Sequence, residues 1–232
     1  MQKNILTRGG VEFIAVFLGI ALSLWVDDYR EEKELSNRIT EDYENIYHEV
    51  KANIGIIETI IGQNIEINAN EEKIIKIFNE EMIYVQNDAV ELASNIFSLT
   101  FFGETSAHRT SVASGRFNSS RNDTLTKQIS ELYEHYFVRL NTNGTWVDDL
   151  FTKGHTIPFY AAINNINNVD SLTIKKYFFS DEFQNNFLFF RFARSIYMNR
   201  LDETRDQLYK VKHSLENYLK DPGFNLQVQV NK

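Results

Sequence analysis

The chain has 232 residues, of which 43% are hydrophobic, and its net charge is −8. So acidic a chain is not a general nucleic-acid binder, because phosphate binding needs a basic surface. The absence of cysteine excludes disulfides, thiolate metal sites and cysteine nucleophiles. Only two prolines and ten glycines are present, which favours long helices, so we expect an all-α fold.

The first predicted element is a transmembrane helix over residues 11–26, in which Glu12 is the only charged residue. At 1.5 Å per residue the run spans about 24 Å, and the two glycines before it bring it close to the ~30 Å hydrocarbon core. Glu12 and Trp25 would lie at opposite interfaces, with Arg8 just outside. An apolar surface all round argues against a core helix. The helical pattern also continues past Ser23, which argues against a cleaved signal peptide and favours an uncleaved anchor.

The charges on either side of this helix predict its orientation. Lys3 and Arg8 precede it, whereas acidic residues outnumber basic ones directly after it. The positive-inside rule therefore predicts residues 1–10 in the cytoplasm. In a bacterium, a helical bundle over residues 27–223 would be periplasmic, followed by a C-terminal tail over residues 224–232.

A ladder of small residues inside the span suggests that two copies of the helix associate. The ladder has i, i+4, i+8 spacing, which allows two helices to approach closely in a membrane. It consists of Ala15, Gly19 and Ser23.

Two long amphipathic helices are expected to form an antiparallel pair. The first continues from the span to about residue 61, because apolar residues recur every three or four positions from Ile39 onward. The second starts after the predicted N-cap Ser180 and stops before Pro222, about 40 residues later.

Shorter elements are predicted between the two long helices. Helices are expected over residues 68–83, 88–102 and 123–140, with a turn at Asn143-Gly144 and a short helix from Trp146 to Phe151. Residues 164–169 are expected to form a loop. The helix over 123–140 should bury one face, made of Leu125, Ile129, Leu132, Tyr136 and Leu140.

One local cluster of basic residues could bind an anion or an acidic partner. It consists of His108, Arg109, Arg116, Arg121 and Lys127. The favoured interpretation is that these side chains pair with acids of the long helices, and that His108 is exposed to solvent.

Arg194 occupies an otherwise apolar position of the second long helix. It could fix the register of the helix pair by facing an acid on the first helix, or its charge could reach water along the helix surface. The candidate partners are Glu41, Glu44 and Glu49. No catalytic, metal-binding or phosphate-binding motif is found, so we expect no cofactor and no enzymatic activity.

Two segments resemble a bacterial family of short single-pass membrane proteins with no assigned function. The first contains Glu12, Val16, Gly19-Ile20, Ala21-Leu22 and Asp27-Asp28-Tyr29, and the second contains Ser114-Gly115, Leu125, Tyr133 and Tyr136-Phe137. The sequence departs from the family at the exit of the span, where Asp-Asp replaces Asn-Asn-Trp. It also departs at Asn118-Ser119-Ser120, which replaces apolar residues. The resemblance implies a membrane-anchored helical protein and no catalytic residue.

These features together predict a binding, scaffold or sensor-like protein of the bacterial inner membrane. The expected partners are the lipid bilayer and either further copies of the chain or another envelope protein. The alternative is an oligomeric membrane effector, in which associated spans form a pore or perturb the bilayer.

Overall fold

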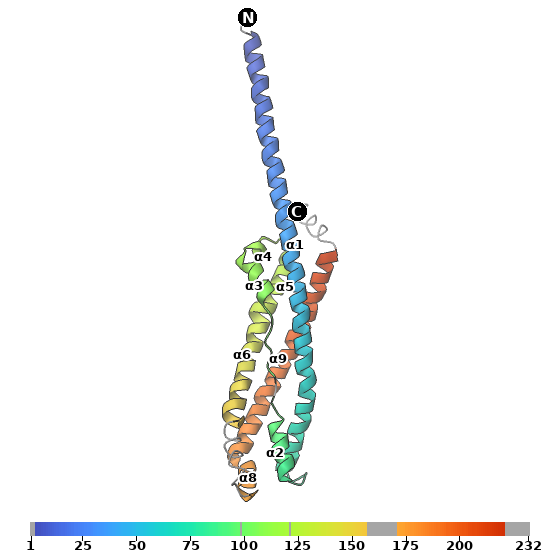
Figure 1. The fold of residues 1–232 in the computed structure, drawn as a ribbon, viewed down its shortest axis with the longest axis vertical. Helices are drawn as coiled ribbons and strands as arrows, with labels where there is room; N and C mark the ends of the chain where they lie inside the picture. The colour runs from blue at the N-terminus through green and yellow to red at the C-terminus, as the bar shows by residue number, and fades with distance from the viewer. Residues whose placement is uncertain (1–2, 98, 121, 157–170, 221–232) are drawn as a thin grey trace.

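A computed structural model describes residues 3–97, 99–120, 122–156 and 171–220. The described residues are helical apart from short connections, and none of them forms a strand. The longest helices are α1 (Lys3–Phe78, 76 residues) and α9 (Asp181–Lys220, 40 residues). The N-terminal part of α1 projects from one end of a helical bundle as a single helix (Figure 1). An all-α fold is therefore confirmed for the described residues.

The remaining helices complete the bundle around α1 and α9. Helices α3 and α4 lie at the end from which α1 projects, and α2 and α8 lie at the opposite end (Figure 1). Two of the segments, η1 and η2, are π-helical and continue α5 and α6 without a break. In chain order the elements are α2 (Gln86–Ser94), α3 (Ser106–Ala113), α4 (Arg116–Ser119), α5 (Asp123–Ser130), η1 (Glu131–Tyr136), α6 (Phe137–Leu150), η2 (Phe151–Thr156) and α8 (Ser171–Phe178).

Helices α1 and α9 pack against each other in antiparallel orientation. The ring of Tyr43 contacts that of Tyr218 near one end of the pair, and Phe78 contacts Phe183 near the other. On each helix one row of buried positions alternates in steps of four and three, the repeat that turns two helices into a left-handed coiled coil. On α1 these positions are Ile39, Tyr43, Ile46, Val50, Asn53, Ile57, Ile60, Asn64, Ile67, Glu71 and Ile74. On α9 they are Phe183, Phe187, Phe190, Arg194, Tyr197, Leu201, Thr204, Leu208, Val211, Leu215 and Tyr218.

The first long helix does not end near residue 61, and the separate helix predicted over residues 68–83 is wrong. Helix α1 runs on to Phe78. A glycine such as Gly62 costs an interior helix position only about 1 kcal/mol relative to alanine. The buried seam continues beyond it through Asn64 and Ile67, so packing on the rest of the bundle outweighs this cost.

The predicted helix over residues 88–102 is also too long at its C-terminal end. Helix α2 stops at Ser94, and most of residues 95–105 form a non-helical connection along the bundle. This connection is held by tertiary contacts. The backbone N–H of Phe101 donates to the hydroxyl of Tyr197 over 2.6 Å.

Asn143-Gly144 is not a turn, because helix runs unbroken from α5 through η2. Gly144 lies inside α6 and faces α9, where a Cβ atom would stand 3.5 Å from the ring of Tyr197. The π-helical turn shifts the buried face by one residue. The neighbours Leu132 and Tyr133 are therefore both buried, and the predicted core residue Tyr136 is only half-buried.

The projecting part of α1 carries apolar side chains that are exposed on every side. Phe13 is 71% exposed at its start and Val26 is 45% exposed at its end. Among the described residues, no helix is both long and apolar enough to cross a membrane. The predicted loop over 164–169 and the tail over 224–232 lie outside the described residues.

Candidate functional site

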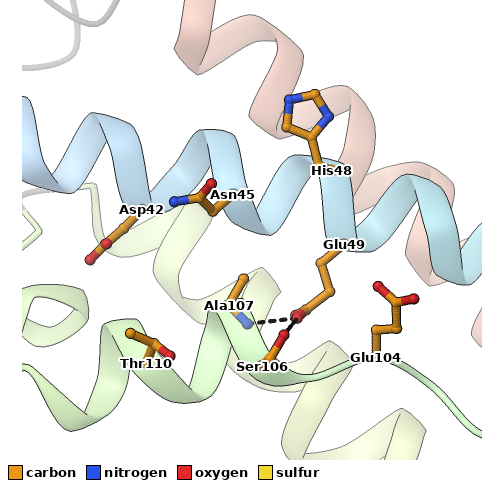
Figure 2. A pocket seen from close by; sticks show the side chains of 8 residues that line it. All are labelled: Asp42, Asn45, His48, Glu49, Glu104, Ser106, Ala107 and Thr110. Atoms are coloured by element: carbon orange, nitrogen blue, oxygen red, sulfur yellow. Dashed lines mark hydrogen bonds between the residues drawn. The ribbon is translucent and has the colours of Figure 1, made fainter.

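An open groove of about 420 Å³ lies between α1 and α3 (Figure 2). We call it the α1–α3 groove. Its walls are polar and carry several acidic side chains. The lining residues are Asp42, Asn45, His48 and Glu49 of α1, and Glu104, Ser106, Ala107 and Thr110 of α3 and the residues before it.

Glu49 caps the start of α3 from another helix. Glu49 is 5% exposed, and its carboxylate accepts hydrogen bonds from the backbone N–H of Ala107 over 2.6 Å and from the hydroxyl of Ser106 over 3.3 Å (Figure 2). The other carboxylate oxygen accepts from the hydroxyl of Tyr133 over 2.6 Å. The first N–H groups of a helix lack partners within it, and the N-cap residue Thr105 supplies no side-chain bond. A carboxylate at this position accepts hydrogen bonds from these groups and also interacts favourably with the positive end of the helix dipole.

Asp42 holds the other end of α3, two helical turns from Glu49. It accepts two hydrogen bonds from the guanidinium of Arg116, over 2.8 and 2.9 Å, and one from the hydroxyl of Ser111 over 2.7 Å. Burial alone would raise the pKa of Asp42. The bonds from Arg116 and Ser111 outweigh that effect and hold the pKa below the ordinary value of 3.8. The Asp42–Arg116 ion pair therefore fixes the α3–α4 turn on α1 as long as Asp42 is ionised.

Asn53 fixes the residues that lead into α3. Its side-chain amide donates to the carbonyl of Glu104 over 2.8 Å and accepts from the N–H of the same residue over 2.7 Å. The amide thus pairs with the backbone of Glu104 as a neighbouring strand would. Asp42, Glu49 and Asn53 act together as three polar contacts along one side of α1.

The chemistry of the groove is that of a docking site for α3 and α4. The buried carboxylates of Asp42 and Glu49 are occupied by a guanidinium, hydroxyls and helix N–H groups. His48 points away from α3 (Figure 2). Among the described residues, no group of three histidine, aspartate or glutamate side chains is arranged to hold a metal ion.

The structure does not bring the predicted basic residues together as one free cluster. Arg116 is engaged by Asp42, whereas Arg109 and Lys127 are exposed. Arg121 lies outside the described residues.

The expected solvent exposure of His108 is wrong. Its side chain is 6% exposed, and its ring stacks on Tyr133 with the centroids 4.2 Å apart and the planes 5° from parallel. The sequence gives little sign of this burial, because α3 is a short helix of mostly small and polar residues.

Arg194 is buried in the α1–α9 seam, but none of its predicted partners faces it. Its guanidinium binds the carboxylate of Glu71, with the side-chain oxygens of Asn64 and Asn68 as further acceptors. The prediction assumed partners near the start of the bundle. In the antiparallel pair, Arg194 instead lies against the far half of α1.

The residues predicted for membrane association all lie on the projecting part of α1. Glu12, Ala15, Gly19, Ser23 and Trp25 are exposed, and a Cβ atom at Gly19 would meet no atom within 4 Å. Arg8 lies in the same helix, and its side chain is outside what the structure describes.

The sequence did not reveal the polar contacts on the inner face of α1, where Glu49 was considered only as a partner of Arg194. Asp42, Glu49, Asn53, Asn64 and Glu71 are all buried. Their signal is a polar side chain on a face otherwise occupied by isoleucine, valine and tyrosine, in a helix where exposed acids are common.

Comparison with known proteins adds a family but no activity. No curated protein and no solved structure matches the chain. A family model matches residues 12–157, a region that contains both segments on which the resemblance was based. The chain therefore belongs to the family of unknown function DUF6090.

Proposed function

We propose that this protein is a membrane-anchored helical protein of the bacterial envelope whose bundle binds or scaffolds a protein partner and has no catalytic activity. Residues 11–26 form its single span, the N-terminus is cytoplasmic and the bundle is periplasmic. The observation that carries the proposal is the exposure of the projecting helix. Apolar side chains from Phe13 to Val26 are between 45% and 71% exposed, with no described element packed on them.

Such a surface is costly in water and favourable in lipid. A helix of a water-soluble protein buries one apolar stripe, whereas this one is apolar all round. The chain returns to charged residues at Asp27 and Asp28, so the apolar surface has a defined end. The apolar run is short for a membrane span, but it can cross if Glu12 and Trp25 lie at the two membrane interfaces, where such side chains are tolerated.

The proposed binding role is supported by how the bundle uses its buried charges. Asp42, Glu49, Glu71 and Arg194 are each bound to another helix and hold the bundle together. Catalytic groups have to lie within reach of a substrate, usually in a pocket. Here the buried charges serve the rigidity of an elongated bundle that presents long outer helix faces.

Membrane association can be tested with one arginine in the centre of the apolar run. We expect the full chain to sediment with membranes and to resist alkaline extraction, and Leu18→Arg to shift it to the soluble fraction. An arginine at the centre of a span costs about 2.5–3.5 kcal/mol. Phe102→Arg is the matched control, because Phe102 is 90% exposed on the bundle and should not affect partitioning.

The proposed anchor fails if the unaltered chain is soluble, or if Leu18→Arg and Phe102→Arg partition alike. The orientation is tested separately with a reporter that is active only in the periplasm, fused after Lys33. An inactive reporter at a membrane-bound fusion would reverse the assignment.

A further inference from the structure

His108 lies where α3, α4 and η1 meet. Its ring stacks on Tyr133, and the ring of Phe117 meets it edge-on with the centroids 5.1 Å apart. The Nε2 atom is buried and has no hydrogen-bond partner within the described residues. A neutral imidazole tolerates this environment at modest cost. An imidazolium would place a buried positive charge there, with a proton that has no acceptor.

The charged groups around the ring do not remove this cost. Glu49 of α1 and Glu134 of η1 act on it, but burial is the larger effect and lowers the pKa of His108 below its ordinary value. Glu49 already accepts bonds from Tyr133 and from the start of α3. On α4, Arg116 is held by Asp42, and Glu104 lies in the segment before α3.

We propose that His108 makes the docking of α3 and α4 sensitive to acid, so that protonation of its imidazole releases these helices from α1 and η1. Release lets the imidazolium reach water. The same movement breaks the bonds from α3 to Glu49 and opens the α1–α3 groove. Both helices lie at the end of the bundle from which α1 projects, so the change would occur next to that helix (Figure 1).

The direction of the pH effect follows from the lowered pKa. The docked state binds fewer protons than the released state, so docking is complete above about pH 6.5 and weakens as the pH falls below it. One proton per release gives up to about a tenfold increase in the released population between pH 7.5 and 5.5. Asp42 titrates below its ordinary value of 3.8 and does not contribute in this range. Tyr133 has a raised pKa and stays protonated throughout.

The test is hydrogen exchange on the full chain in detergent micelles at pH 7.5, 6.5 and 5.5. Protection factors, which correct for the intrinsic pH dependence of exchange, should fall up to about tenfold across residues 105–119 and stay constant across α9. His108→Phe keeps an aromatic ring but cannot be protonated, so its protection should not depend on pH in this range. His48→Phe is the matched control, because His48 is an exposed histidine that lines the α1–α3 groove, and its variant should respond as the unaltered chain does.

Constant protection of residues 105–119 in the unaltered chain overturns the proposal, as does an unchanged pH response in His108→Phe. If His108→Phe does not fold, His108→Gln supplies the neutral variant. The imidazole titration of the unaltered chain, followed by NMR, then gives an independent answer. A His108 pKa at or above about 6.5 contradicts the proposal.

Discussion

Arg194 and Glu71 form a buried, two-bond ion pair across the α1–α9 seam. The Nε atom donates to Oε1 over 2.8 Å and Nη2 donates to Oε2 over 2.6 Å, and the two side chains are 3% and 1% exposed. Both residues occupy positions of the four-three repeat that are otherwise mostly apolar. A charged pair at such positions selects one register of two long helices, because a shift by one turn would leave both charges buried without a partner.

Arg194→Leu is expected to destabilise the bundle by about 3–5 kcal/mol, because Glu71 keeps its buried charge and loses its main partner. The double variant Arg194→Leu/Glu71→Leu should recover part of this loss, since the charges of both partners are then removed, whereas the buried Asn64 still lacks its bond from Arg194. Chemical denaturation followed by circular dichroism, with the full chain in micelles, measures both free energies of unfolding.

The matched control for this cycle is Arg200→Leu. Arg200 pairs with Glu203 on the surface of α9, with exposures of 28% and 48%, so its loss should cost about 1 kcal/mol or less. A double variant as unstable as Arg194→Leu alone would contradict the register role of the pair.

Glu49→Gln should loosen α3 while leaving the long helices intact. Glutamine removes the charge at the start of α3, and its NH2 group cannot accept the bonds that a carboxylate oxygen of Glu49 accepts from Ala107 and Ser106. Two charge-assisted bonds are therefore weakened, each worth about 1.5–3 kcal/mol. We expect faster amide exchange in residues 105–113 and unchanged exchange in α9. Glu44→Gln serves as the control on the same helix, because Glu44 is exposed. Equal exchange in both variants would contradict capping by Glu49.

The second long helix could be predicted because its signals are local and repeated. The N-cap Ser180, the four-three repeat and the stop before Pro222 predict a helix of about 40 residues, and α9 spans Asp181–Lys220. The side chain of Ser180 accepts from the N–H of Phe183 over 3.2 Å, as an N-cap should.

The errors fall where tertiary contacts override local signals. The Asn143-Gly144 pair predicts a turn, but Gly144 supports close packing of α6 on α9. The π-helical turn at Tyr133 replaces Tyr136 in the core, and no local pattern marks it. The groove depends on residues such as Glu49 and Ala107, 58 positions apart, which the sequence cannot pair.

Two glycine substitutions should change stability in opposite directions. Gly55→Ala should stabilise α1 by about 0.5–1 kcal/mol, because alanine favours the helix and its Cβ atom meets open space. Gly103→Ala should destabilise by about 1–3 kcal/mol, because its Cβ atom would lie 2.6 Å from the buried ring of Phe101. Thermal unfolding measures both, at roughly 2–4 °C per kcal/mol for a chain of this size. A Gly103→Ala variant as stable as Gly55→Ala would contradict the tight packing of this connection.

Acid should weaken the anchoring of the α3–α4 turn through Asp42, at lower pH than the effect assigned to His108. Because its pKa is lowered on docking, the docked state binds fewer protons. The stabilisation is therefore complete above the ordinary aspartate pKa of 3.8 and is lost as the pH falls through the lowered pKa.

Asp42→Asn should abolish this part of the pH dependence, and Glu41→Gln, a change at an exposed neighbour, should preserve it. Amide exchange of residues 111–119 between pH 5 and 2 measures the effect. An Asp42→Asn variant with the acid response of the unaltered chain would show that another group controls the turn, since only Asp42 binds Arg116 and Ser111 together among the described residues.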